Sequence, residues 1–204
     1  MPSRCSASRV NPRRRARIAA LAVLLLAPVV APAHAATAWA VDPAQSSLTF
    51  HPTLAGGEFA GRFEQFEATI RFEPADLAHS SLLVVVDLLA ARTGDPDRDT
   101  ALQGADFFLT SRWPQARFAS TAIKALGGNK YEATGKLTLR DATRDIRLAL
   151  HFDPPAAAGG VAKLTGSTTV KRLEFGVGQG DWRGTEWLAD AVRVEFSLAL
   201  RAPH

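Results

Sequence analysis

The feature that most constrains the fold is an alternation of apolar and polar side chains, which is clearest near the end of the sequence. Between residues 191 and 201 every second residue from Val192 to Leu200 is apolar, whereas the residues between them, such as Arg193 and Glu195, are mostly polar. Successive side chains of a β-strand point to opposite faces, so this pattern is typical of a strand that buries only one face. A chain built from such strands must bring their apolar faces together.

The same pattern, interrupted by turn sequences, recurs along the chain. Gly127-Gly128-Asn129 predicts a tight hairpin, and residues 141–143 predict a second turn. We predict strands over residues 46–54, 59–63, 66–72, 81–89, 117–126, 130–139, 144–152, 162–170 and 191–201. About eight antiparallel strands joined in this way predict an all-β fold, a closed barrel, with a β-sandwich as the alternative.

Residues 92–108 interrupt the series of strands with a polar turn and a segment that lacks alternation. We predict a short helix over residues 97–109. Asp97 or Asp99 is suitably placed to cap the start of this helix, and Gly104 to divide it. The barrel is therefore expected to carry one helical insertion.

The strand predicted at residues 81–89 differs from the others because it is apolar on both faces. Three consecutive valines, residues 84–86, disfavour a helix there. We expect the outer face of this strand to be covered, and the helical insertion that follows it is the candidate cover.

The first 35 residues have the features of a secretory signal peptide. Six arginines precede an apolar run over residues 18–30, and Ala33-His34-Ala35 is a small-x-small cleavage site. The run is shorter than the ~20 residues that a membrane-spanning helix needs, which disfavours an N-terminal anchor. The arginines at residues 13–15 leave a twin-arginine export route open beside the general one. We expect cleavage near Ala35, a periplasmic location and one mature domain, residues 36–204.

Removal of residues 1–35 changes the charge of the protein. The full chain has 24 Lys and Arg against 20 Asp and Glu, and loss of the six arginines leaves 18 against 20. A mature chain without excess positive charge does not favour nucleic-acid or anionic-membrane binding. Cys5, the single cysteine, is removed as well, so the mature chain is expected to have no disulfide or thiolate site.

An ordered series of short motifs spans almost all of the mature chain. The motifs are WAVD and SSLTF (residues 39–42 and 46–50), GRFEQF (61–66), Thr93-Gly94 with Arg98-Asp99, Leu102 and Asp106-Phe107-Phe108, Trp113-Pro114 with FAST (118–121), GKLTL (135–139), and Arg172 with Phe175 and Gly176-Val177-Gly178. The series resembles the YceI-like family of periplasmic lipid-binding proteins. Residues 180–187, with Trp182 and Trp187, match none of the motifs, and we expect them to reshape one mouth of the barrel.

The resemblance implies an eight-stranded antiparallel lipocalin-like barrel with a short helical insertion. It also implies an apolar channel that holds an isoprenoid lipid, polyprenyl or quinone-like. The alternation predicts the residues that line such a channel: Phe50, Phe59, Phe63, Phe66, Phe118, Leu137, Leu139, Ile146, Leu148, Val194 and Phe196. An ordinary packed core made of the same residues is the alternative.

Three further residues of the insertion are candidates for ligand contact. Phe107 and Phe108 are expected to help close one end of the barrel. Arg98 offers a planar fork of donors that suits a phosphate or quinone head group at the mouth. The alternative for Arg98 and Asp99 is an ion pair or cap that fixes the helix.

Residues for catalysis or metal binding do not stand out. The mature histidines His51, His79, His151 and His204 include no two at metal-ligand spacing. A G-x-S-x-G nucleophile elbow is absent, and the glycine-rich residues 176–180 do not join a strand to a helix as nucleotide-binding loops do. We predict a binding protein and not an enzyme, with no catalytic residue, metal or resident cofactor.

The preferred hypothesis is thus a periplasmic carrier of an isoprenoid lipid. Two alternatives stay open: a module that transiently contacts a membrane redox partner, and an enzyme acting on a small amphiphile with Arg98 and Asp99 in its site. The sequence is compatible with a monomer or a homodimer.

Overall fold

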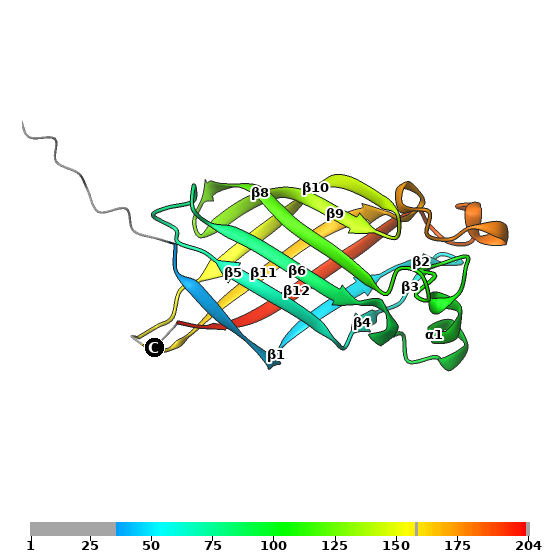
Figure 1. Ribbon diagram of the computed structural model, residues 1–204, viewed down its shortest axis with the longest axis horizontal. Coiled ribbons are helices and arrows are strands. Elements are labelled where there is room, and N and C mark those ends of the chain that lie inside the picture. Colours follow the sequence, from blue (N-terminus) through cyan, green and yellow to red (C-terminus); the bar gives the residue numbers. More distant parts are fainter. Residues whose placement is uncertain (1–35, 158, 203–204) are drawn as a thin grey trace, which may run out of the picture. The chain divides into compact units, whose positions relative to one another are not determined.

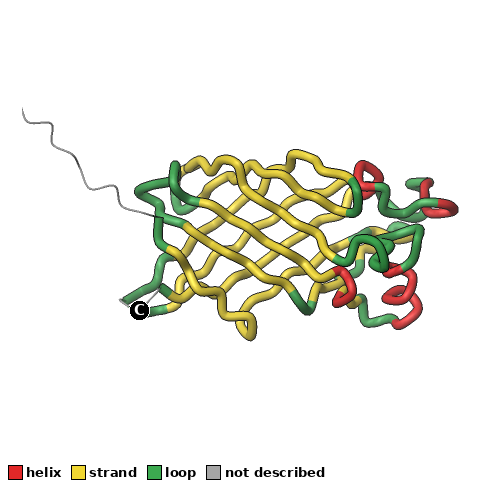
Figure 2. The backbone as a smooth tube through the Cα atoms, in the orientation of Figure 1, coloured by secondary structure: helices red, strands yellow, loops and turns green. Residues whose placement is uncertain are grey.

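The strands of the computed structural model, which describes residues 36–157 and 159–202, are antiparallel and close into a barrel (Figures 1 and 2). Along the chain they are β1 (Ala38–His51), β2 (Thr53–Leu54), β3 (Gly57–Glu58), β4 (Gly61–Phe63), β5 (Phe66–Arg71), β6 (Ser81–Asp87), β7 (Ala91–Arg92), β8 (Gln115–Gly127), β9 (Lys130–Leu139), β10 (Ala142–Asp153), β11 (Val161–Lys171) and β12 (Ala191–Arg201). The helical segments are α1 (Pro96–Gln103) and the short 3-10 helices Leu88–Ala90, Arg172–Phe175 and Gly180–Arg183.

The ring of strands follows the order β12-β11-β10-β9-β8-β6-β5-β1, and β1 pairs back onto β12 to close it. The start of β1 pairs with β5, whereas its end pairs with the short strand β4, which in turn pairs with β7. The prediction of an eight-stranded antiparallel barrel with one short helix is confirmed. Closure leaves the main strands without a free edge, which removes a route to aggregation.

The closing pair, β1 with β12, contains an irregularity that bends β1. Its register shifts between Asp42 and Ser47, where residues 43–46 form a bulge. The Ser46 hydroxyl fills the gap, because it accepts a hydrogen bond from the Ala199 N–H and donates one to the Asp42 carbonyl. Arg201 Nη2 also donates to the Asp42 carboxylate, at 3.0 Å. The bulge lets β1 turn from β5 at its start to β4 at its end.

The buried side chains form two clusters, one toward each end of the barrel. The first surrounds Phe72, Tyr131 and Phe152 and fills the end where β1 begins and β12 finishes. The second surrounds Phe50, Leu88, Phe108, Phe175 and Val177 at the opposite end, near α1 and the loops (Figure 1). Each large apolar side chain buried in this way contributes ~1.5–3 kcal/mol of transfer free energy.

The helical insertion is shorter than predicted. Helix α1 ends at Gln103 with Gly104 as its C-cap, so Gly104 terminates the helix and does not divide it. Its N-cap is Asp95, whose carboxylate accepts hydrogen bonds from the N–H groups of Asp97 and Arg98. The predicted caps, Asp97 and Asp99, were wrong because Pro96 occupies the first helical position, which moves the cap to the residue before it.

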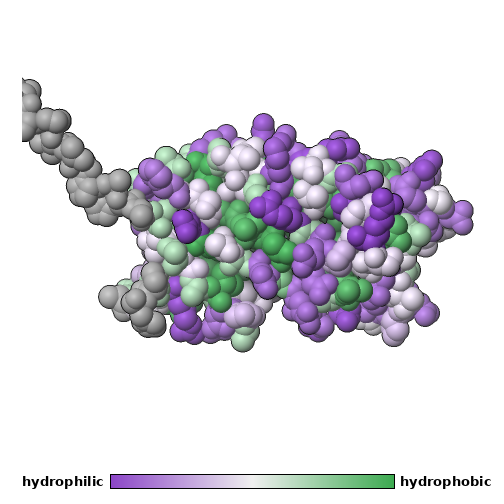
Figure 3. Space-filling view, viewed as in Figure 1, coloured by the Kyte–Doolittle hydropathy of each residue, from purple (hydrophilic) through white to green (hydrophobic). Residues whose placement is uncertain are grey.

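Strand β6 is not covered by the insertion. Helix α1 lies beyond the strand ends, at one mouth of the barrel (Figure 1), so Leu83 and Val85 on the outer face of β6 stay partly exposed. The strand also ends at Asp87, and Leu89 is 45% exposed in the 3-10 helix that follows. Hydrophobic side chains are correspondingly visible at the surface over the middle of the barrel in Figure 3.

Of the two predicted turns, one is confirmed and one is displaced. Gly128 and Asn129, both with positive φ, turn the chain between β8 and β9. The next turn lies at Arg140 and Asp141, and Thr143 already belongs to β10, where it pairs with Thr138. Arg140 adopts φ +56° to make this tight connection, a conformation that its residue type did not indicate.

The predicted signal peptide and its cleavage site, residues 1–35, lie outside the described residues. Among the residues that are described, none forms a helix with the length and apolar character needed to cross a membrane.

Candidate ligand-binding channel

The interior of the barrel contains a cavity of about 270 Å³ that opens toward the end carrying α1. Strands on all sides of the barrel contribute to its wall, and the side chains that line it are almost all apolar. Besides Trp182, the lining residues with polar side chains are Thr93, Arg98, Thr168 and Arg172. A cavity lined in this way excludes water and accepts an apolar guest.

Every residue predicted from the sequence to contact a ligand lines this one cavity. They are Phe50, Phe59, Phe63, Phe66, Arg98, Phe107, Phe108, Phe118, Leu137, Leu139, Ile146, Leu148, Val194 and Phe196. The geometry favours a channel over an ordinary packed core made of the same residues. Contact between these residues and a ligand stays a prediction.

The channel stays open because phenylalanines lie against its wall instead of crossing it. The ring of each of three inward phenylalanines occupies the space that a side chain would need at a glycine on the neighbouring strand. The pairs are Phe50 with Gly61, Phe118 with Gly135, and Phe196 with Gly166. A Cβ atom at any of these glycines would overlap the ring, so glycine is required there for the rings to lie flat.

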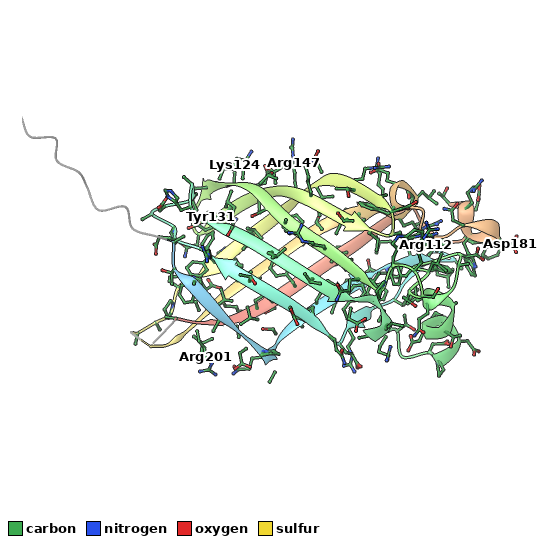
Figure 4. The ribbon with its side chains drawn as sticks, viewed as in Figure 1. Arg112, Lys124, Tyr131, Arg147, Asp181 and Arg201 are labelled. Atoms are coloured by element: carbon green, nitrogen blue, oxygen red, sulfur yellow. The ribbon has the colours of Figure 1, made fainter. Side chains whose placement is uncertain are left out.

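The channel is closed at the end away from α1. Its lining stops at Ile70, Leu82, Leu148 and Leu198. The next inward side chains along the strands are Phe72, Leu150, Leu164 and Leu200, which are buried but do not line the cavity. Phe72 packs against Tyr131 and Phe152 with ring centroids 5.0 and 4.9 Å apart, and Tyr131 lies at this closed end in Figure 4. We call the four inward residues Phe72, Leu150, Leu164 and Leu200 the floor of the channel.

Among the residues that line the channel, Arg98 of α1 carries the accessible positive charge at the open end. Its guanidinium lies 4.5 Å from the centroid of the Phe59 ring, which is a cation–π contact. Its Nη2 lies 3.7 Å from the Asp95 carboxylate, and 40% of the side chain is exposed. Arg98 therefore has both the predicted place at the mouth and the alternative role of an ion pair within the helix.

Asp99 has a structural role beside Arg98. Its carboxylate accepts hydrogen bonds from the N–H and the hydroxyl of Thr93, both at 2.7 Å, and so ties α1 to the strand before it. Burial opposes ionisation of Asp99, but these hydrogen bonds and the charges of Arg92 and Arg98 outweigh it and lower the pKa of the carboxyl group. Asp99 thus fixes the helix that presents Arg98.

A second arginine, Arg172, holds the loop over the mouth, residues 172–190, and was not predicted as a site residue. It is 3% exposed and directs its guanidinium into the loop. Its donors bind the backbone carbonyls of Val177, Gly178, Gly184, Leu188 and Ala189, at 2.8–3.2 Å. Burial lowers the pKa of Arg172, and the charge of Asp190 partly opposes this shift. An arginine that directly follows a strand and precedes a glycine-rich loop was the available signal.

The loop and the helical insertion meet across the mouth. The Asp106 carbonyl accepts hydrogen bonds from the N–H groups of Gly178 and Gln179, at 2.6 and 2.8 Å. The Trp182 ring packs on Phe107, with centroids 5.6 Å apart, and lines the channel. Trp187 is 72% exposed and does not line the channel. Of the two tryptophans expected to reshape the mouth, Trp182 does so.

Other lining residues were also missed. Those on alternating strands could have been found by extending the pattern: Leu48, Ile70, Thr168, Val170, Val192 and Leu198. Val84 and Val86 lie on β6, which is apolar on both faces, so alternation does not select them. Those outside the barrel strands follow no period, such as Pro52, Leu54 of the short strand β2, Val177 and Leu188. Their place depends on how each loop folds back over the mouth.

Arg98 and Arg172 are the charged residues that line the channel, and each guanidinium nitrogen of Arg172 already donates to a backbone carbonyl. In residues 36–157 and 159–202, His, Cys, Asp and Glu side chains form no group of three or more that could hold a metal ion. Charged side chains such as Lys124 and Arg147 point away from the barrel (Figure 4).

Sequence comparison identifies relatives along most of the chain. The model of the YceI-like domain matches residues 39–200. A UPF0312 protein of Vibrio cholerae is 31% identical over 140 residues, which cover 66% of this chain and 73% of the relative. A UPF0312 protein of Shewanella putrefaciens is 30% identical over 167 residues, covering 78% of this chain and 85% of the relative.

Solved structures give the same result. The crystal structure of Burkholderia cenocepacia BcnA superposes with a TM-score of 0.75 at 32% identity and covers 78% of this chain and 99% of BcnA. A polyisoprenoid binding domain from Saccharophagus degradans shares the fold, with a TM-score of 0.61 at 16% identity over 82% of this chain and 99% of that domain. The family model covers far more than half of the sequence, and the chain belongs to the YceI-like family.

Proposed function

We propose that the protein is a carrier that holds the apolar chain of an isoprenoid-type amphiphile, polyprenyl or quinone-like, inside its barrel. The observation that carries this proposal is the apolar channel, closed at one end and open at the other. Each CH₂ group removed from water contributes ~0.8 kcal/mol, so even a short chain gains several kcal/mol before the cost of ordering it. Binding, and not catalysis, is the function that this geometry supports.

The ligand enters tail first in this proposal. The residues that close the far end, Phe72, Leu150, Leu164 and Leu200, are apolar, whereas the mouth presents Arg98, whose side chain is 40% exposed. Its guanidinium donors suit the oxygens of a phosphate or of a quinone. The polar end of the ligand therefore stays near α1 and in contact with water.

One structural relative is described by the same class of ligand. The fold is shared with a domain described as polyisoprenoid binding, although the identity of 16% between the two chains carries the fold alone. We further propose that the carrier acts in the periplasm after removal of residues 1–35, which rests on the sequence of that segment. An apolar chain does not cross an aqueous compartment unaided, so a carrier has a purpose there.

The test is native mass spectrometry of the protein recovered from the periplasm, followed by extraction and fragmentation of any bound lipid. Val84 lines the channel and its neighbour Val85 faces outward, so the pair provides a matched control. We expect wild type and Val85→Trp to carry a lipid with isoprene spacing, and Val84→Trp to lose it because the indole fills the channel. Wild-type protein that carries no lipid, and binds none of the prenyl lipids offered to it, contradicts the proposal.

A further inference from the structure

We infer that the floor of the channel sets the length of the apolar chain that the protein selects. The inference rests on the proposed function, because it concerns the same channel. It adds a specificity determinant that lies at the closed end, remote from the mouth where the head group is held.

The floor is built to resist displacement. Three of its four residues have essentially no exposed surface: Phe72, Leu164 and Leu200. The Phe72 backbone is held as well, because its carbonyl accepts a hydrogen bond from Trp39 Nε1 at 2.9 Å and its N–H donates to the Thr37 carbonyl at 2.9 Å. Close packing of this kind does not yield to an inserted chain without forcing side chains out of their rotamers.

The space above the floor is the cavity itself, which has an apolar lining and can hold a chain. The volume of the channel, about 270 Å³, is just below the range for ligand pockets, ~300–1,000 Å³. A chain that fits between mouth and floor gains from every buried methylene, about fourfold in affinity for each. A longer chain cannot pass the floor, so its extra methylenes stay in the mouth or in water and gain little. The position of the floor therefore decides which chain length is preferred.

Two substitutions on β10 move the floor in opposite directions. Leu148 lines the channel just above the floor, so Leu148→Phe places a larger side chain in the empty space and shortens the channel. Leu150 is part of the floor, so Leu150→Ala removes an isopropyl group and lengthens it. Leu148→Phe leaves the four residues of the floor unchanged and keeps the test valid if Leu150→Ala does not fold.

Matched controls make the same chemical changes outside the channel. Leu89→Phe enlarges a leucine that is 45% exposed on the outside. Leu77→Ala removes an isopropyl group that packs on the closed-end cluster without lining the channel. Each variant and the wild type are loaded with an equimolar mixture of geraniol, farnesol and geranylgeraniol, and native mass spectrometry gives the ratio of bound alcohols.

We expect Leu148→Phe to shift the ratio toward the shorter alcohols and Leu150→Ala toward the longer ones, by at least about fourfold, the value of one methylene. The control variants are expected to match wild type. If wild type binds the alcohols but both Leu148→Phe and Leu150→Ala keep the wild-type ratio, the inference is overturned while the proposed function stands. If wild type binds none of the alcohols, the proposed function fails and the inference fails with it.

Discussion

The guanidinium of Arg98 lies 4.5 Å from the centroid of the Phe59 ring, which joins α1 to the segment after β3 at the mouth of the channel. The contact keeps the ring in the lining while the donors of Arg98 remain accessible to a head group. One side chain thus shapes the apolar entrance and supplies the positive charge beside it. Comparing ligands with a charged and an uncharged head group separates these two roles of Arg98.

Replacing Arg98 by Gln is expected to weaken binding of a prenyl phosphate by about tenfold to a hundredfold, the value of a hydrogen bond to a charged group. Binding of the prenyl alcohol with the same chain is expected to change little, because the apolar channel is intact. Titration of both ligands by intrinsic fluorescence measures the difference. Arg112→Gln is the control, since Arg112 contacts Trp113 and does not line the channel. Equal losses for both ligands would show that Arg98 acts only through Phe59.

Replacing Gly166 by Ala is expected to narrow the channel and to destabilise the barrel. A Cβ atom there overlaps the Phe196 ring, which must then leave the wall and enter the lumen, and it also lies 2.8 Å from the Ala149 carbonyl oxygen on β10, so part of the strain falls on the backbone. Overpacking of this kind costs about 1–3 kcal/mol of the free energy of unfolding. Chemical denaturation measures this cost and lipid loading measures the narrowing. Adding Phe196→Leu to Gly166→Ala is expected to recover loading, whereas unchanged loading in Gly166→Ala alone would contradict this account of the wall.

The same pairs show where prediction from the sequence succeeds and where it stops. Alternation placed Phe118 and Phe196 on the inner face correctly, because side-chain direction in a strand depends only on parity. It did not distinguish an open channel from a packed core, because that depends on which residue lies across from each ring. The partner of Phe196, Gly166, is known only once the register of β11 with β12 is fixed.

The mouth was less predictable than the walls. Arg98 was found because an arginine fork suits an anionic or carbonyl head group, whereas Arg172 was missed because all its partners are backbone carbonyls of its own loop. Carbonyl positions in a loop leave no pattern of residue types in the sequence. The helix cap was misplaced for a related reason, since Asp95, Asp97 and Asp99 are chemically alike and only the geometry at Pro96 selects Asp95.

Replacing Arg172 by Met is expected to loosen the loop over the mouth without opening the barrel. The change leaves buried carbonyls such as those of Val177 and Leu188 without their donor, at a cost of about 1–3 kcal/mol for each that water cannot reach. Hydrogen exchange should accelerate in residues 172–190 and stay slow in β9 and β10, and a bound lipid should dissociate faster. Arg183→Met, in the same loop but exposed, is expected to behave as wild type. If hydrogen exchange in Arg172→Met were faster in all the barrel strands as well, Arg172 would support the whole fold and not the loop alone.

Stability is expected to decrease in acid through Asp42 at the closing pair of strands. The Arg201 hydrogen bond, aided by Gln45 and the Ala44 N–H, lowers the pKa of Asp42 below its ordinary value, although desolvation partly opposes the shift. Because the folded-state pKa is the lower one, the stabilisation is present above the unfolded-state pKa of ~3.9 and is lost as the pH falls through the folded-state pKa. The melting temperature of wild type should therefore be steady between about pH 5 and 8 and fall below about pH 4.

The contribution of Asp42 is isolated by Asp42→Asn, which keeps the shape of the side chain and removes its charge. This variant should melt at a lower temperature than wild type at neutral pH, and the gap should narrow in acid as the wild-type carboxylate becomes protonated. Asp141→Asn, in the exposed turn between β9 and β10, is the control and should follow the wild-type curve. A constant gap between Asp42→Asn and wild type down to about pH 2 would show that the ion pair with Arg201 does not stabilise the junction of β1 with β12, and that the Ser46 bridge holds it alone.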